Sequence, residues 1–489
     1  MIFIKINDLN LCILKPFYFL LVLLKYKFSY MGKSVLWSLR LGFSNKQSNL
    51  IEKEGILNFL ENSFASDFSK DAPICLKDSP KKIAAIRELR KQYRDKTDEE
   101  RRKLIKSTLI DSLEFKKWWI DEIRNQKYPL REKMVLFWHN HFVSTSQKVK
   151  VNWWIYEHNT ILRENAFGNF KELTKKILKS NAMITYLDNQ DNRKNKLNEN
   201  LSRELLELFT IGIGNYTEND IKNGAKALAG LLPDDNEGTY RPFFENNEDI
   251  EYFGKKGKFK ADDLVDIIFE QKNTPYLIVR KILKWFIYDN PKEDLVKYYG
   301  DYFREVDFEI KPLLIKIFTE EFPKNTSGSK IKNPLEYILQ LTDSLNCNSI
   351  DSGLIYFFLK QQGMDLYDQP NVKGWDGGNS WLTSQIYLQR NNVSDLLCNG
   401  RTISRKALNN MDNMTIETIN VSIKFDSNQR PYQIINDLSN ANLFEVSDEL
   451  QKDFESLLKY DFDPKSKNAN DAVLRLFNFI TKTPEYQLI

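Results

Sequence analysis

Two of the three histidines in the sequence lie in one short segment, "VLFWHNHFVS", at residues 135–144. Imidazole side chains act as metal ligands and as general acids or bases, so His139 and His141 are candidates for both kinds of chemistry. If the segment is an α-helix, the two rings point about 200° apart and cannot bind one metal ion together. If it is extended, a His-x-His pair points to one face, as a metal site requires. A third interpretation is a buried aromatic ridge in which each imidazole donates to a backbone carbonyl.

The carboxylates that such a site would use are found in "NENLSRELLELFTIGIG", at residues 198–214. Glu204 and Glu207 are three residues apart, so on a helix they share one face. A glutamate pair on an otherwise apolar helix suits metal or acid/base chemistry. Together with His139 and His141, the pair gives four candidate ligands for a divalent metal ion, which would be the cofactor.

The same segment also has a purely structural interpretation. Arg203 is four residues from both Glu199 and Glu207, the spacing at which side chains pair on a helix. With Asn200, these residues would form a polar network that ties helices together without chemistry. In either case we expect the glutamates to share one polar cluster with the two histidines of residues 135–144, because a carboxylate on an apolar helix is costly to bury unpaired.

A glycine-rich motif, "GWDGGNSWLT" at residues 374–383, is a candidate anion site. Gly377, Gly378 and Ser380 could present backbone N–H groups to an anion at a helix N-terminus, with Asn379 or Ser380 as the N-cap. A glycine-rich turn packed by the two tryptophans of the motif would explain the same residues without a ligand.

The elements that must position these residues are predicted to be helices. Apolar residues recur at three- and four-residue spacing along most of the chain, and Thr217 with Asp220 forms a capping-box pattern. Gly212 and Gly214 are placed to close the helix that contains "RELLELF". The best strand candidate is residues 415–425. The fold class is therefore mostly α: a single large multi-helix domain with little or no β-sheet.

Composition limits the class of partner. The chain has 71 Lys and Arg against 67 Asp and Glu, a nearly neutral balance, so we expect no nucleic-acid partner. Charge is concentrated near residues 79–107, where eleven basic and five acidic residues alternate at helical spacing. This pattern predicts a solvated, charged helical hairpin.

Residues 1–30 form an apolar leader. Its apolar run, Pro16–Leu24, is too short to span a bilayer and is followed by no small-residue cleavage site. Two interpretations stay open: a mis-assigned start, with translation beginning at Met31 and a cytoplasmic protein, or a weak signal or anchor, with an exported or membrane-anchored one. Contact with a membrane is expected only through this leader.

Four motifs, "FWHNHFVS", "AFGNFKELTKKIL", "NENLSRELLELFTIGIGNYT" and "NVKGWDGGNSWL", resemble the bacterial family catalogued as domain of unknown function (DUF) 1800. The resemblance runs from about Met31 to "TPEYQLI" and implies one helical domain over residues 31–489. It also implies a partner from a second family, DUF 1501, which is alkaline-phosphatase-like. Many members carry a His-Asp pair before an "FG" loop. This chain reads "FFENNEDIEYFG" there, so no role of that histidine transfers.

Two functions follow as expectations. The first is a non-enzymatic scaffold that binds a cell-surface polymer or the alkaline-phosphatase-like partner. The alternative is a metal-dependent, hydrolase-like enzyme with a His/Glu site. Geometry separates them: the imidazoles and carboxylates either converge beside a cleft or are each held by arginine or backbone.

Overall fold

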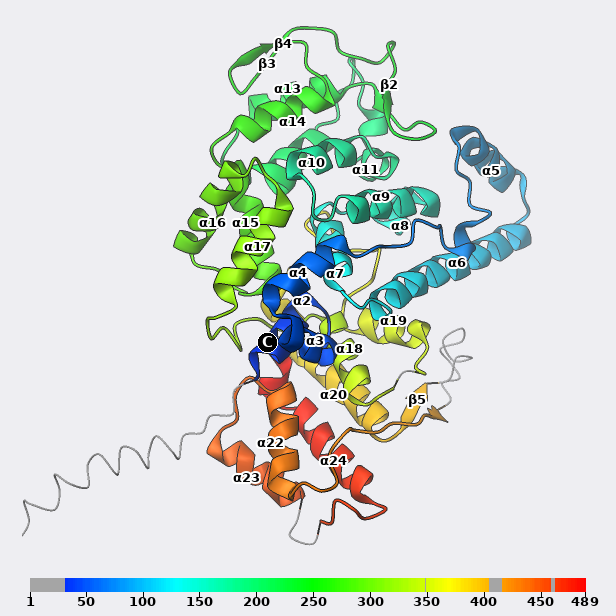
Figure 1. Ribbon diagram of the computed structural model, residues 1–489. Helices are drawn as coiled ribbons and strands as arrows, with labels where there is room; N and C mark the ends of the chain where they lie inside the picture. Colours follow the sequence, from blue (N-terminus) through cyan, green and yellow to red (C-terminus); the bar gives the residue numbers. More distant parts are fainter. Residues whose placement is uncertain (1–30, 348, 404–415, 459–461) are drawn as a thin grey trace, which may run out of the picture.

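The structure, a computed structural model, describes residues 31–347, 349–403, 416–458 and 462–489. It confirms the mostly α fold class, because the strands in these ranges form only two-stranded antiparallel pairs among many helices (Figure 1). The predicted leader, residues 1–30, lies outside the described residues. Within them, no helix is both long and apolar enough to cross a membrane.

The N-terminal part of the chain supplies the helices around α7, which carries "WHNH". Its elements are α2 (Lys33–Leu41), η1 (Asn45–Gln47), α3 (Ser48–Glu54), α4 (Ile56–Ala65), η2 (Ile74–Leu76), α5 (Ile83–Asp95), α6 (Asp98–Arg124), α7 (Leu130–His141), α8 (Ser146–Val149), α9 (Asn152–Glu164), α10 (Phe170–Leu178) and α11 (Asn181–Tyr186). Helix α7 packs against α4, α6 and α9. Nearly all of its side chains are buried, so it is a central helix of the core.

Two helices, α5 and α6, lie in the range of the predicted charged hairpin. The capping box of Thr97 and Glu100 starts α6. Most side chains between residues 87 and 112 are exposed, and the buried positions of α6 begin at Phe115. Figure 1 shows α6 extending outward from the helical body.

The middle of the chain contains a change of helix type. Its elements are η3 (Asn189–Asp191), α12 (Asn200–Glu204), the π-helix η4 (Leu205–Thr210), α13 (Glu218–Leu228), the pairs β1 (Leu231–Leu232) with β2 (Thr239–Tyr240) and β3 (Ile250–Tyr252) with β4 (Lys255–Gly257), α14 (Ala261–Glu270), α15 (Thr274–Phe286), α16 (Glu293–Glu305) and α17 (Ile310–Glu321). The predicted helix through "RELLELF" is thus α-helical only to Glu204. The predicted capping box of Thr217 and Asp220 is confirmed at the start of α13.

The C-terminal part of the chain forms the lower part of the view in Figure 1, and its last residues turn back toward the middle. Its elements are α18 (Pro334–Ser344), α19 (Ser352–Gln361), η5 (Gly378–Trp381), α20 (Ser384–Cys398), β5 (Arg401–Ile403) paired with β6 (Ile416–Thr418), α22 (Pro431–Asn442), α23 (Asp448–Leu457), α24 (Ala469–Thr481) and η7 (Pro484–Gln487). A strand was predicted over residues 415–425. Within the described residues of that range, only β6 pairs with another strand.

The last residues are tied to the segment before α18. The Lys330 N–H donates to the Ile489 carbonyl at 3.0 Å, and the Ile489 N–H donates back at 2.8 Å. The Lys332 N–H donates to the Gln487 carbonyl at 2.9 Å. Ile489 is fully buried and belongs to the same apolar cluster as Met31, so the described chain packs around one core from end to end.

Candidate functional site

Helix α7 places the two candidate histidines on different sides. It continues to His141, so the helical alternative for "WHNH" holds and the extended one is wrong. Both rings are buried, with exposures of 0% for His139 and 3% for His141. They therefore have separate surroundings.

His139 lies in an aromatic environment. Its ring packs edge-on against Tyr367 and His158, each with a centroid distance of 5.3 Å. Gln369 Nε2 lies 3.3 Å from its Nδ1. Burial lowers the pKa of His139 well below its ordinary value, so the ring is neutral. The third histidine, His158, is fully buried, and its Nε2 donates to the Phe142 carbonyl at 2.9 Å.

His141 instead reaches the end of the π-helix. Its Nε2 lies 3.1 Å from the Phe209 carbonyl, so this nitrogen carries the hydrogen and donates. Its Nδ1 is left as an acceptor, and Lys281 Nζ on α15 donates to it at 3.1 Å. Lys281 also donates to the Leu208 carbonyl at 3.0 Å. The last carbonyls of a helix lack intrahelical partners, which is why η4 can accept from both side chains.

The predicted carboxylates do not join the histidines. Arg203 pairs with Glu199 at 3.2 Å and with Glu207 at 3.4 Å, as the structural interpretation expected, and also with Glu218 at 3.0 Å. About a third of the Arg203 side chain is exposed, with a value of 34%, so this network lies near the surface. The Glu204 side chain has no hydrogen bond or ion pair with another described residue, and burial raises its pKa.

The helix that carries these glutamates changes to a π-helix after Glu204. Glu204 and Glu207 still interact across this change, because the charge of Glu207, after burial, raises the pKa of Glu204. Asn200 is exposed, and its backbone N–H, rather than its side chain, bonds Asn198 at 3.0 Å. Among the described residues, no group of three or more His, Cys, Asp or Glu side chains is arranged to hold a metal ion. The structure thus does not bring the four predicted ligands together.

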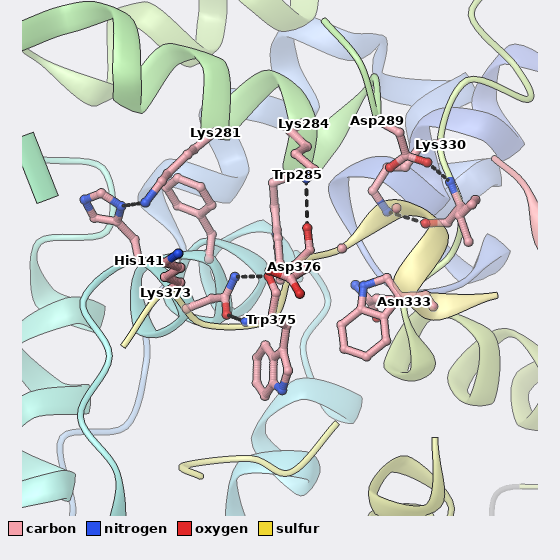
Figure 2. Close-up of a pocket in the computed structure, with 16 residues that line it drawn as sticks. His141, Lys281, Lys284, Trp285, Asp289, Lys330, Asn333, Lys373, Trp375 and Asp376 are labelled. Carbon is pink, nitrogen blue, oxygen red and sulfur yellow. Dashed lines mark hydrogen bonds between the residues drawn. The ribbon is translucent and has the colours of Figure 1, made fainter. Parts of the chain in front are cut away.

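His141 does line a pocket of about 210 Å³ (Figure 2). We call it the basic pocket. It lies between α7, α15, residues 330–333 and the loop 373–378 of the glycine-rich motif. Its charged side chains are four lysines and two aspartates: Lys281, Lys284, Lys330, Lys373, Asp289 and Asp376. Its aromatic side chains are Phe137, Trp285, Trp375 and Trp381.

Asn140, between the two histidines, joins α7 to the loop. Its Oδ1 accepts from the Trp375 N–H at 2.7 Å. Gly374 has φ +84°, and a Cβ there would lie 2.3 Å from Asn140 Oδ1. Only glycine therefore allows this close approach of loop and helix. The "WHNH" and "GWDGG" motifs, far apart in sequence, meet at this contact.

The predicted anion residues are divided. Gly377 and Gly378 line the basic pocket. Ser380 does not line it, and its Oγ donates back to the Gly377 carbonyl at 2.8 Å. The predicted N-cap, Asn379 or Ser380, is wrong: α20 begins later, and the Thr383 side chain accepts from the Ile386 N–H. The intervening turn is the short 3₁₀ element η5.

The charge of the basic pocket is only partly balanced. Lys330 is paired with the buried Glu336 at 2.7 Å. Lys281, Lys284 and Lys373 have no ion pair with any described carboxylate. Lys284 donates to the Asp376 carbonyl at 2.8 Å, and burial raises the pKa of Asp289. The pocket therefore presents excess positive charge to a ligand.

Sequence analysis missed the lysines of α15 and the role of Asn140. The lysines occur in "YLIVRKILKWFIYD", whose apolar spacing predicted the helix but gave no sign of a facing pocket. An asparagine that bonds a distant backbone carries no local signal. The only indication was the position of Asn140 between the two histidines, next to the apolar run 134–138.

Comparison with known proteins gives a family match. A family model described as "Protein of unknown function (DUF1800)" matches residues 35–488, nearly the whole chain. No curated protein and no solved structure matches.

Proposed function

This chain belongs to the DUF1800 family, whose description assigns no function, and we propose its function from the basic pocket alone. We propose that the protein is a non-enzymatic binding protein that recognises an anionic sugar unit of a cell-surface carbohydrate polymer. The observation that carries the proposal is the combination, in one pocket, of three lysines without carboxylate partners in the described chain and three tryptophans. Cations attract a carboxylate, sulfate or phosphate, and flat indole faces pack against the apolar face of a sugar ring.

The size of the pocket supports a single unit rather than a long ligand. Its volume of about 210 Å³ is below the range of roughly 300–1,000 Å³ typical of sites for drug-sized molecules. One monosaccharide carrying an acidic group matches this space. The chain end or a side branch of a polymer would then enter, with the rest of the polymer outside.

The hydrolase alternative has no specific observation in its favour, because the candidate ligands have separate partners. His141 is hydrogen-bonded to the Phe209 carbonyl and to Lys281, and Glu207 forms an ion pair with Arg203. The alkaline-phosphatase-like partner stays a prediction that rests on the family resemblance.

The test is calorimetric titration of the protein at low ionic strength with glucuronate, glucose and inorganic phosphate. We expect glucuronate to bind at least about tenfold more tightly than the other two, with affinity falling as salt is added. If glucose binds as tightly as glucuronate, the lysines do not contribute to the affinity. If phosphate binds as tightly as glucuronate, the tryptophans do not contribute to it. Absence of glucuronate binding would refute the proposal.

Variants localise the site. Lys373 is exposed and its side chain makes no hydrogen bond or ion pair with another described residue, so Lys373→Ala removes charge without removing a structural bond. We expect this variant to weaken glucuronate binding about two- to fivefold. Lys258→Ala, a matched change at an exposed lysine outside the pocket whose side chain also makes no hydrogen bond or ion pair with another described residue, should leave binding unchanged.

A further inference from the structure

Lys281 differs from the other lysines of the basic pocket in its partners. Its Nζ donates to two neutral acceptors, His141 Nδ1 and the Leu208 carbonyl, and to no carboxylate in the described chain (Figure 2). A neutral amine has two N–H bonds and one lone pair. The two acceptors therefore satisfy both N–H groups of the neutral form and leave its lone pair free in the pocket.

The charges around this amine also favour its neutral form. His141 is itself neutral, since burial lowers its pKa well below the ordinary value. Lys284, one turn along α15, and Lys373, on the loop, add positive charge to the same pocket, which also contains Asp289 and Asp376, but neither carboxylate pairs with Lys281. From the π-helix only carbonyls reach Lys281, because Glu207 is held by Arg203 and the hydroxyl of Tyr216. Burial and the neighbouring Lys284 lower the pKa of Lys281 to about 8.

We propose that Lys281 is a nucleophilic amine that forms a reversible imine with the carbonyl group of a small anionic ligand in the basic pocket. The ammonium first releases a proton to solvent. The lone pair of Nζ then forms a bond to the carbonyl carbon, and the carbonyl oxygen leaves as water with the two amine hydrogens. No atom is oxidised or reduced, so the step needs no further reactant. Lys284 and Lys373 would hold the anionic group. The inference rests on the proposed anion recognition by this pocket.

The probe is glyoxylate, the smallest anionic aldehyde, added to the intact protein with cyanoborohydride, which reduces an imine to a stable amine. Peptide mass spectrometry then gives the rate of labelling at each lysine. We expect Lys281 to be labelled at least about tenfold faster than Lys284 at pH 7.5, because only the free amine reacts. The rate at Lys281 should rise with pH and level off above about pH 8.

A second buried lysine is an internal control. Burial also lowers the pKa of Lys133 to about 8, but Lys133 is fully buried and paired with Glu336 at 2.8 Å. It should stay unlabelled, which would show that the pocket as well as the pKa is required. Lys281→Arg keeps a positive charge and should abolish the fast label. The wild-type peptide map gives the answer even if this variant does not fold.

Glycolate, the same anion without the carbonyl, separates this inference from the proposed function. Added in excess, it should slow the labelling of Lys281 by occupying the pocket. If glycolate binds by calorimetry but Lys281 is labelled no faster than Lys284, the imine is refuted and anion recognition stands. If glycolate neither binds the protein nor slows the labelling of Lys281, any fast labelling is independent of anion recognition. That result would refute both the anion site and the imine with an anionic ligand.

Discussion

Asn140 and Trp375 are joined by two hydrogen bonds of opposite direction. The Trp375 N–H donates to Asn140 Oδ1 at 2.7 Å, and Asn140 Nδ2 donates to the Trp375 carbonyl at 3.4 Å. The Asn140 side chain on the central helix α7 thus holds the backbone of the loop that forms a wall of the basic pocket. The shape of the pocket depends on this pair.

The first prediction concerns that pair. Asn140→Ala should lower the free energy of unfolding by about 1–3 kcal/mol, because the buried backbone of Trp375 loses both partners. Asn140→Asp keeps the acceptor for the shorter bond and should cost less. Chemical denaturation measures both. Ser380→Ala, which removes one exposed bond within the loop, is the control. Equal losses in all three variants would contradict the prediction.

The second prediction separates backbone strain from steric contact. Gly374 and Gly363 have nearly equal φ angles of +84° and +83°, but a Cβ at Gly363 would meet nothing within 4 Å. Gly363→Ala should therefore cost only the left-handed strain of about 1–2 kcal/mol. Gly374→Ala adds the clash with Asn140 and should cost clearly more. Melting temperatures of the two variants test this, and a similar loss in both would show that the loop moves freely from α7.

The third prediction concerns the histidines. Burial lowers the pKa of His139 and His141 well below the ordinary value and that of His158 to about 4. Because the folded-state pKa values lie below the unfolded value of about 6.5, the unfolded chain binds more protons in acid. Stability is then full above pH 6.5 and falls as the pH drops toward the folded-state values. The three imidazole NMR signals should not titrate between pH 8 and 6. A midpoint near 6.5 in any of them would show an exposed ring.

The fourth prediction compares two arginines. Arg163 makes two bonds of 2.8 Å to Glu132, and both side chains are almost fully buried. Removing it leaves a buried, unpaired carboxylate, so Arg163→Ala should cost about 3–5 kcal/mol. Arg203→Ala should cost no more than about 1 kcal/mol, because its network is exposed to solvent. Denaturant titration of both variants measures the two losses of unfolding free energy. A larger loss for Arg203→Ala than for Arg163→Ala would contradict the prediction.

Local patterns predicted the fold well. The capping box at Thr217 and the apolar spacing of the helices depend on residues close in sequence, and the structure has them. The π-helix after Glu204 could not be predicted, because α- and π-helices share the same apolar pattern over six residues. The N-cap at Thr383 was missed because Asn379 and Ser380 have equally suitable side chains.

The site could be predicted only in part. Sequence analysis selected His141, Gly377 and Gly378, which line the basic pocket, but grouped His141 with glutamates that have other partners. Type and spacing identify polar residues that need a partner. Which partner they find depends on the packing of α7 against α15 and the loop, and no local pattern records that packing.

The pairing of residues 487–489 with Lys330 and Lys332 has a consequence for the order of events during synthesis. The pocket wall at residues 330–333 emerges from the ribosome long before the residues that hydrogen-bond its backbone. Contacts so distant in sequence form only after both segments are available. While the chain grows, this wall already has nearby partners, because the Ile331 N–H donates to Asp289 at 2.8 Å and Lys330 pairs with Glu336 at 2.7 Å, but it lacks the bonds to residues 487–489. The wall of the basic pocket therefore gains its full set of backbone hydrogen bonds only after residue 489 has been synthesised.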